Sequence, residues 1–165
     1  MEQNQVMVKM VLDRWFALIK NFDTTFGQLS DEDLQREIAP GKNRGIYLLG
    51  HMVAVHDDML RLLDWGNKQY PDLFETFVTQ PDKAVANLPS AKELRANWAA
   101  QVADMTAKIN GTPTGDWFNK HTAVTAEEFA KEPYRNKLNI MLTRCTHMAY
   151  HHGQLIYLLP NKIND

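Results

Sequence analysis

The sequence predicts an all-α protein folded as a four-helix bundle, with a long connection between the third and fourth helices. Apolar residues recur at three- and four-residue steps in four segments, polar connections separate these segments, and the Val/Ile/Thr alternation typical of strands is absent. The composition, 165 residues with 44% hydrophobic and 23% charged, is that of an ordinary globular domain. We therefore expect residues 1–165 to form a single domain.

Each of the four helices is indicated by its apolar stripe and by signals at its ends. Residues 6–22 form the first stripe, and residues 46–68 form the second, which the stretch "YPDLFE" closes. A serine and a glutamate in capping-box spacing at residues 90–93 begin the third helix, which ends at "NGTPTG". The fourth helix begins near Lys137 and stops at Pro160, because a proline ring excludes the preceding helical hydrogen bond.

Two shorter helical turns are expected in the connections. Ser30 is followed by three acidic residues, which is typical of a capped first turn, so a short turn should extend to about Ile38. The polar segment between the third and fourth helices contains Thr125, which can cap one further turn. This segment should cross the bundle.

The charge and the composition exclude several function classes. A net charge of −2 without a dense run of Lys or Arg argues against nucleic-acid partners. No apolar run approaches the roughly 20 residues that span a bilayer, so we expect no membrane insertion. The single cysteine, Cys145, cannot form an internal disulfide, and the opening "MEQNQVMVKM" lacks the features of a secretory leader. A cytoplasmic location is therefore expected.

The histidines are the residues that best suggest chemistry. Five of the six lie in the second and fourth predicted helices, whereas His121 lies in a connection and is expected to face solvent. His147 and His151 are one helical turn apart, which brings their Cβ atoms within about 5–6 Å on one face. That spacing suits a metal ion but also occurs without one, so the pair alone leaves both interpretations open.

A partly polar seam runs beside the apolar stripes of both helices. The residues that share these faces with the histidines are Ile140, Thr143, Arg144 and Gln154 on the fourth helix, and Val55, Asp58 and Leu62 beside His51 on the second. His56 and His152 lie on or near the apolar stripes, where packing suits them better than metal ligation. Asp58 and His152 are candidates for supporting residues around a metal. Cys145, at a core position, is expected to act as a small hydrophobe, and the tryptophans are expected to pack.

Two segments carry a family resemblance. "LLGHMVAVHDDML" at 48–60 and "THMAYHHGQLIYLL" at 146–159 resemble the signature segments of the DinB/YfiT-like superfamily. The resemblance implies that His51, His147 and His151 supply three ligands to a divalent metal. Gly153 and Gln154 also match, while His152 stands where the family usually has a basic residue. An alignment with His56 as the ligand of the second helix stays open, although the preceding "GH" favours His51.

Three neutral imidazoles leave a bound ion its full charge and at least one open coordination position, which is the arrangement of a catalytic metal site. The resemblance implies thiol-dependent chemistry, as in S-transferases that use bacillithiol or a mycothiol-dependent maleylpyruvate isomerase, and it implies a homodimer. We therefore expect a metal-dependent thiol S-transferase or a hydrolase-like enzyme, whose partners are a low-molecular-weight thiol and a small electrophile. Zn or Ni is the expected metal, with Fe, Co and Mn as alternatives. The alternative function is a non-catalytic, stress-associated helical dimer or a small-ligand-binding module.

Overall fold

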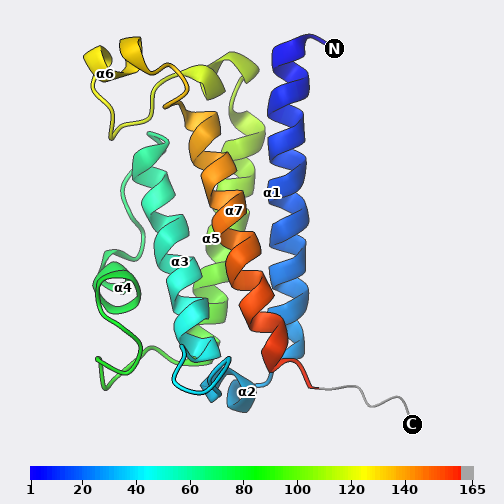
Figure 1. Ribbon diagram of the computed structural model, residues 1–165, viewed down its shortest axis with the longest axis vertical. Helices are drawn as coiled ribbons and strands as arrows, with labels where there is room; N and C mark the ends of the chain where they lie inside the picture. The colour runs from blue at the N-terminus through cyan, green and yellow to red at the C-terminus, as the bar shows by residue number, and fades with distance from the viewer. Residues whose placement is uncertain (161–165) are drawn as a thin grey trace.

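The computed structural model describes residues 1–160, and these residues contain α-helices but no strands, which confirms the all-α prediction (Figure 1). They form seven α-helices, of which four are the expected long helices, two are the short helices expected after Ser30 and Thr125, and one, in the connection after the second long helix, was not expected. The helices are α1 (Gln3–Gln28), α2 (Asp31–Gln35), α3 (Gly45–Leu62), α4 (Pro71–Phe74), α5 (Ala91–Gly111), α6 (Ala126–Lys131) and α7 (Lys137–Leu155).

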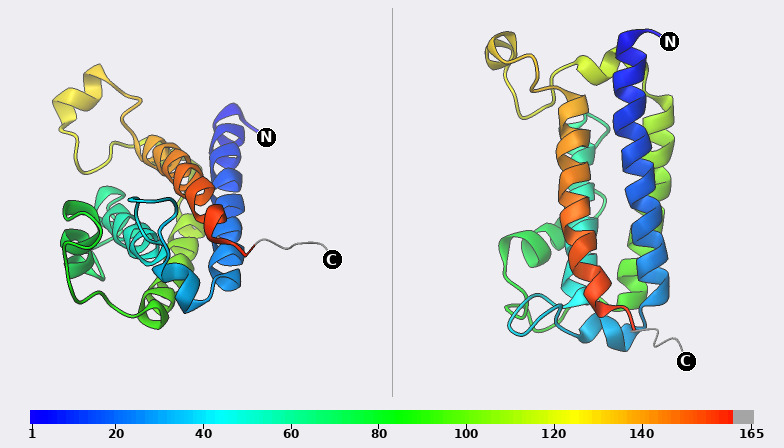
Figure 2. Two further views of the ribbon diagram at one scale, coloured as in Figure 1. Left: turned by 60° about the horizontal axis from the view of Figure 1, so that its bottom comes forward. Right: turned by 45° about the vertical axis from the view of Figure 1, so that its right-hand side comes forward.

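The four long helices, α1, α3, α5 and α7, lie side by side along the long axis of the molecule (Figure 1, Figure 2). α7 packs against both α1 and α3, and α5 packs against α3. α1 and α7 run in one direction along this axis, while α3 and α5 run in the other. As a result α3 and α7 are antiparallel neighbours, so residues early in α3 face residues late in α7.

The interior between the long helices is filled by aromatic and aliphatic side chains. Trp15, Phe22 and Trp98 are buried there, and the ring centroids of Phe22 and Trp98 lie 5.7 Å apart. The predictions of packed tryptophans and of a buried Cys145 are confirmed, and burial raises the pKa of the Cys145 thiol to about 11. In the part of the chain that the structure describes, no helix combines the length and apolar character needed to cross a membrane.

Helix ends follow the capping signals with one difference. Ser30 and Thr125 cap α2 and α6 as predicted, each accepting a hydrogen bond from the backbone N–H three residues later. α3 ends at Leu62 rather than near residue 68, because the chain turns through a positive φ of 61° at Asp64 and of 125° at Gly66. The sequence pattern hid this turn, since the apolar stripe continues beyond it.

The connection between α3 and α5 covers one side of α3 and contains α4 and a π-helical turn, η1 (Glu75–Thr79). The sequence did not predict these two elements. Phe77 in η1 is fully buried and lies directly over Gly50 of α3, where an added Cβ would come within 2.4 Å of Cε1 of the Phe77 ring. The missing side chain at Gly50 therefore allows η1 to pack closely onto α3.

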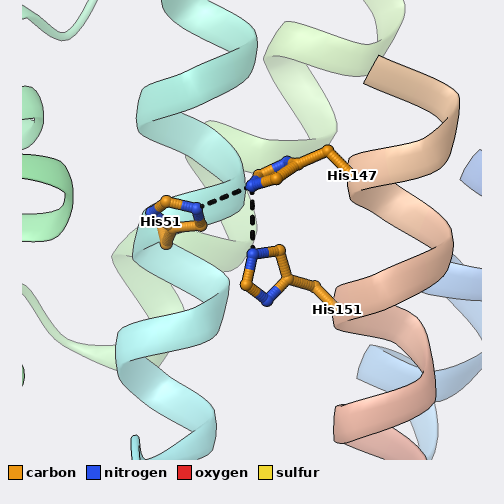
Figure 3. Close-up of side chains that lie close together, drawn as sticks. All are labelled: His51, His147 and His151. Atoms are coloured by element: carbon orange, nitrogen blue, oxygen red, sulfur yellow. Dashed lines mark hydrogen bonds between the residues drawn. The ribbon is translucent and has the colours of Figure 1, made fainter. Parts of the chain in front are cut away.

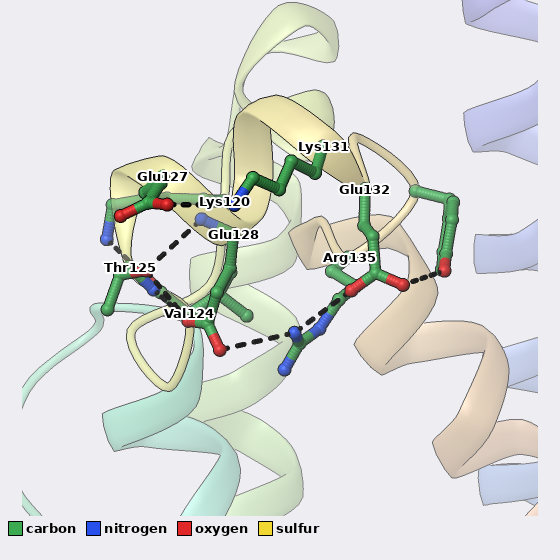
Figure 4. A network of polar contacts seen from close by, with 9 residues as sticks. Lys120, Val124, Thr125, Glu127, Glu128, Lys131, Glu132 and Arg135 are labelled. Atoms are coloured by element: carbon green, nitrogen blue, oxygen red, sulfur yellow. Dashed lines mark hydrogen bonds and ion pairs between the residues drawn. The ribbon is translucent and has the colours of Figure 1, made fainter.

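The connection between α5 and α7 contains the 3-10 helix η2 (Thr114–Phe118) and α6 at one end of the bundle (Figure 1). Polar contacts hold this segment, including ion pairs of Arg135 with Glu128 at 3.6 Å and with Glu132 at 3.2 Å (Figure 4). The prediction that His121 faces solvent is wrong, because this residue is only 8% exposed. The N–H of its neighbour Thr122 donates to the Leu62 carbonyl and draws the loop onto the end of α3.

Candidate metal centre

Three histidines meet in the seam between α3 and α7 (Figure 3). His51 projects from α3, while His147 and His151 project from consecutive turns of α7. The Nε2 atom of His147 lies 3.1 Å from Nε2 of His51 and 3.0 Å from Nε2 of His151. One ring nitrogen from each residue lies within 4.8 Å of the other two, so the antiparallel pairing of α3 and α7 gathers three nitrogen donors at one point.

The outer nitrogens of two of these rings are held by oxygen acceptors. Nδ1 of His51 lies 2.7 Å from the Phe77 carbonyl, and Nδ1 of His151 lies 2.8 Å from Oε1 of Gln154. A carbonyl oxygen can only accept, so each Nδ1 carries the hydrogen and donates it. In the neutral rings this leaves the lone pair on Nε2, the nitrogen that faces the other histidines.

The protein alone supplies too few hydrogen-bond donors for these converging lone pairs. His147 can donate an Nε2 hydrogen to one neighbour at a time, and its Nδ1 is shielded from solvent with no partner among the described residues. A metal cation bound by all three nitrogens would engage their three lone pairs at the same time. Zn–N bonds of about 2.0–2.1 Å in a tetrahedron place ligand nitrogens roughly 3.3 Å apart, close to the two Nε2 separations measured here.

The electrostatics of the cluster also favour the neutral, metal-binding form of the rings. Burial lowers the pKa of His147 to about 3, and burial is also the main cause that lowers the pKa values of His51 and His151. All three rings are therefore neutral at pH 7. Because only unprotonated imidazole binds a metal, little free energy is lost to proton release on binding.

The orientation of His51 depends on the packing of η1. Gly50 admits the Phe77 ring, and this close approach brings the Phe77 carbonyl within reach of Nδ1 of His51. One turn earlier in α3, Tyr47 stacks on the His51 ring at 6.3 Å and 11°, and its hydroxyl donates to the Gln80 carbonyl at 2.7 Å. The "GH" pair of the sequence thus has a structural reason, because the glycine makes room for the acceptor that the histidine needs.

His56, the alternative ligand of the second predicted helix, lies outside the cluster. It is 1% exposed, and its ring packs 5.0 Å from Trp15 and 5.2 Å from Trp98, measured between centroids. Burial lowers its pKa well below the usual value for histidine. His51 rather than His56 therefore faces the two histidines of α7.

The two predicted supporting residues point elsewhere. Nε2 of His152 lies 3.0 Å from Oγ1 of Thr25 on α1, and Asp58 pairs with Arg61 at 3.2 Å and with Lys68 at 3.1 Å. Within residues 1–160, neither side chain hydrogen-bonds to the three histidines. The oxygen acceptors around the cluster are instead the Phe77 carbonyl and Gln154.

Sequence reasoning missed these two acceptors for different reasons. Gln154 stands three residues after His151, a helical spacing that brings two side chains together, so this spacing could have identified it. No pattern marks the Phe77 carbonyl, because it depends on a π-helical turn in a segment with no helical periodicity. The sequence marks Arg144 only as a neighbour of the histidines on the same face of α7.

A surface groove along α7 is lined in part by His147 of the cluster. It has a volume of about 560 Å³ and is open to solvent. The residues that line it are Asn139, Leu142, Thr143, Thr146, His147 and Tyr150. His147 therefore belongs both to the cluster and to a surface that a small molecule can reach.

The fold and the site together define a helical protein with three histidines positioned to bind a metal ion. The profile of the DinB superfamily matches residues 16–155, and the chain belongs to this family, whose members bind metals. A crystal structure described as the conserved protein of locus from Enterococcus faecalis is similar, with 16% identity, 96% of this chain and 95% of that chain covered, and a TM-score of 0.59. That likeness shows a shared fold. No curated protein matches the chain.

Proposed function

We propose that the chain binds one divalent metal ion through Nε2 of His51, His147 and His151 and acts as a metal-dependent enzyme on a small electrophile. The observation that carries this proposal is the convergence of the three nitrogens, with the Nδ1 hydrogens of His51 and His151 directed to fixed oxygen acceptors. Three neutral ligands with room for a fourth favour a catalytic over a structural metal site.

A divalent ion held there supplies Lewis acidity, which favours the deprotonated form of a thiol or a water molecule in the remaining coordination position. The contributions of the chain itself are positional. Gln154 and the Phe77 carbonyl fix two imidazole rings, and the groove along α7 admits the reactants beside His147. Transfer of a low-molecular-weight thiol to an electrophile is the leading reaction, and hydrolysis is the other reaction that the same site supports.

Zn or Ni is the proposed metal, because neutral imidazole nitrogen suits both ions. Fe, Co and Mn are alternatives. The donor set does not select among them by affinity alone, since the order of affinities at such a site is common to most nitrogen ligands. The identity must therefore come from direct measurement of the metal that supports turnover.

The first experiment is elemental analysis of untagged protein after reconstitution with Zn²⁺ or Ni²⁺. Wild type should bind about one ion per chain, and His147→Ala should bind none while its helical circular dichroism is retained. His152→Gln is a matched control on the same helix, because its side chain contacts Thr25 rather than the cluster. Stoichiometric metal in His147→Ala would refute the proposed ligand set.

A second candidate function is a non-catalytic homodimer. Exposed apolar side chains gather along α1 and α7, where Met10 is 67% and Leu142 is 52% exposed, and they line an apolar groove of about 320 Å³. A second copy of this chain is the proposed occupant of this surface. Analytical ultracentrifugation of wild type and of a Met10→Glu, Leu142→Glu variant tests it, with a dimer expected only for wild type.

A further inference from the structure

Arg144 is a cation without a partner beside the three histidines. It lies on α7 three residues before His147 and seven before His151, so the three side chains share one face of the helix. Nε of Arg144 is shielded from solvent and has no hydrogen-bond partner in residues 1–160, and no ion pair to its guanidinium is present there. The residue as a whole is only partly buried.

This position is electrostatically unfavourable for the protein alone. Burial is the main cause that lowers the pKa of Arg144, although the group stays charged at any physiological pH. The carboxylate whose charge opposes this shift is Asp58, but Asp58 is already paired with Arg61 and Lys68. A buried charge without a hydrogen-bonded counterion costs free energy.

The positive charge of Arg144 lies close to the histidines, since Arg144 is one helical turn before His147 on the same face of α7. A divalent ion at the cluster would add a second positive centre in the same seam. Two like charges at short range repel each other unless an anion lies between them or beside them. The charges in the seam between α3 and α7 therefore favour the binding of a negative group next to the metal position.

We propose that Arg144 binds the carboxylate of the small molecule that occupies the site, so that the reactant selected is an anionic one. This proposal rests on the proposed function, because it assigns the substrate class of the same site. A carboxylate is the favoured anion because its two oxygens match two adjacent N–H groups of a planar guanidinium. Arg144 is then a specificity-determining residue, and the preferred thiol or electrophile carries a carboxylate.

The test on the wild-type protein uses two thiols of similar size. Thioglycolate carries a carboxylate and 2-mercaptoethanol carries a hydroxyl instead. Titration of each into the Co²⁺-loaded protein, followed by the visible absorption of the ion, should show thioglycolate binding at least about 10-fold more tightly, as expected for one charge-assisted contact. Equal affinities would overturn the proposal without any variant being made.

The variants separate recognition from structure. Arg144→Gln should remove the preference for thioglycolate, and Arg144→Lys should retain part of it because the charge remains but the paired N–H groups are lost. Arg14→Gln is the matched control, since it removes the same charge from an exposed position on α1 and should leave the preference unchanged. Circular dichroism and metal content are recorded for every variant.

Metal affinity distinguishes a role of Arg144 in binding the anion from a role in holding the site together, because the two roles predict opposite changes in Zn²⁺ affinity. Loss of the positive charge in Arg144→Gln should leave Zn²⁺ affinity unchanged or higher, whereas a distorted site would bind Zn²⁺ less tightly. Weaker Zn²⁺ binding together with weaker thioglycolate binding would show that Arg144 supports the fold of the site, and would overturn the proposal.

A final arm keeps the two proposals distinguishable if wild type binds no metal. Acetate is titrated into the metal-free protein, and the side-chain Nε–H resonance of Arg144 is followed by nuclear magnetic resonance. A saturable shift of this resonance, which is assigned by its loss in Arg144→Gln, would support carboxylate binding although the metal proposal had failed. No shift in that metal-free protein would overturn the Arg144 proposal as well.

Discussion

His51 and His56 lie five residues apart on the same helix, yet the structure places them in opposite environments. The His51 ring lies in the seam between α3 and α7, where both of its nitrogens have partners. The His56 ring lies in the aromatic core between Trp15 and Trp98, and its Nε2 is shielded without a partner. Five residues turn a helix by about 500°, so the two rings leave α3 well apart in direction.

The difference shows what makes a buried histidine a candidate ligand. Both rings have lowered pKa values, so neutrality at pH 7 does not separate them. The outer contact does, because the Phe77 carbonyl holds the hydrogen of His51 on Nδ1 and leaves the Nε2 lone pair facing α7. His56 has no such acceptor in the described structure, and its neighbours are aromatic faces rather than other donors.

The strongest test of this contrast compares metal affinity and stability in two variants, because each substitution should affect mainly one of these properties. His51→Ala should lower metal affinity by more than about 100-fold, beyond what loss of an outer hydrogen bond causes, while the metal-free protein stays folded. His56→Ala should leave the metal stoichiometry of the folded protein intact but lower its stability by about 2–4 kcal/mol, as expected for a cavity in a packed core. Metal titration measures the affinity of both variants, and urea unfolding measures their stability. Loss of metal in folded His56→Ala would break the distinction.

Two glycine substitutions test whether the packing of η1 on α3 holds the acceptor for His51 in place. Gly50→Ala places a methyl group against the Phe77 ring, so η1 must shift and the acceptor for His51 moves with it. We expect a stability loss of about 1–3 kcal/mol and metal affinity about 10–100-fold weaker. Gly153→Ala is the matched control, because nothing lies within 4 Å of its added Cβ. It should stabilise α7 by about 0.5–1 kcal/mol and leave the metal affinity unchanged.

The sequence predicted what depends on local periodicity. The one-turn spacing of His147 and His151 and the caps at Ser30 and Thr125 follow from helical geometry, and the structure bears them out. The tryptophans pack as predicted, with three of the four buried and Trp65 partly buried against the core. The choice of His51 over His56 came from the family resemblance and from the place of His56 in the apolar stripe of the second helix. What periodicity left unknown was the relative rotation of α3 and α7, which brings His51 to His147 and His151.

What the sequence could not predict depends on contacts between distant segments. The π-helical turn at Glu75–Thr79 brings the Phe77 carbonyl to His51 only after it packs over Gly50. His121 is buried because its loop folds back onto the end of α3. No local pattern records either contact, since both are fixed by the packing of the whole chain.

Gln154 offers a smaller test of the same outer-contact argument on α7. Gln154→Leu removes the acceptor for Nδ1 of His151, so the ring loses its fixed tautomer and orientation. Metal affinity should fall about 10-fold, the lower end of the range for loss of an outer hydrogen bond. Gln154→Glu keeps an acceptor and should restore most of the affinity. An unchanged affinity in Gln154→Leu would mean that helical packing alone orients His151.

The pH dependence of the metal-free protein gives the smallest expected effect. Because the folded-state pKa of His147 is about 3 and that of an unfolded histidine is about 6.5, the unfolded chain binds more protons between these values. The free energy of unfolding should therefore be highest above about pH 6.5 and should fall as the pH is lowered toward 3. Thermal unfolding from pH 8 to pH 4, with chelator present, measures this slope.

His147→Gln should reduce that slope, because one neutral ring that must stay unprotonated in the folded state has been replaced by a group that does not titrate. The reduction should be modest, since the ring is partly exposed and solvent screens its charge. His56→Phe should reduce the slope further, since burial lowers the pKa of His56 as well. If neither substitution changes the slope, acid destabilisation arises from the carboxylates, and the neutrality of these two rings contributes nothing to stability.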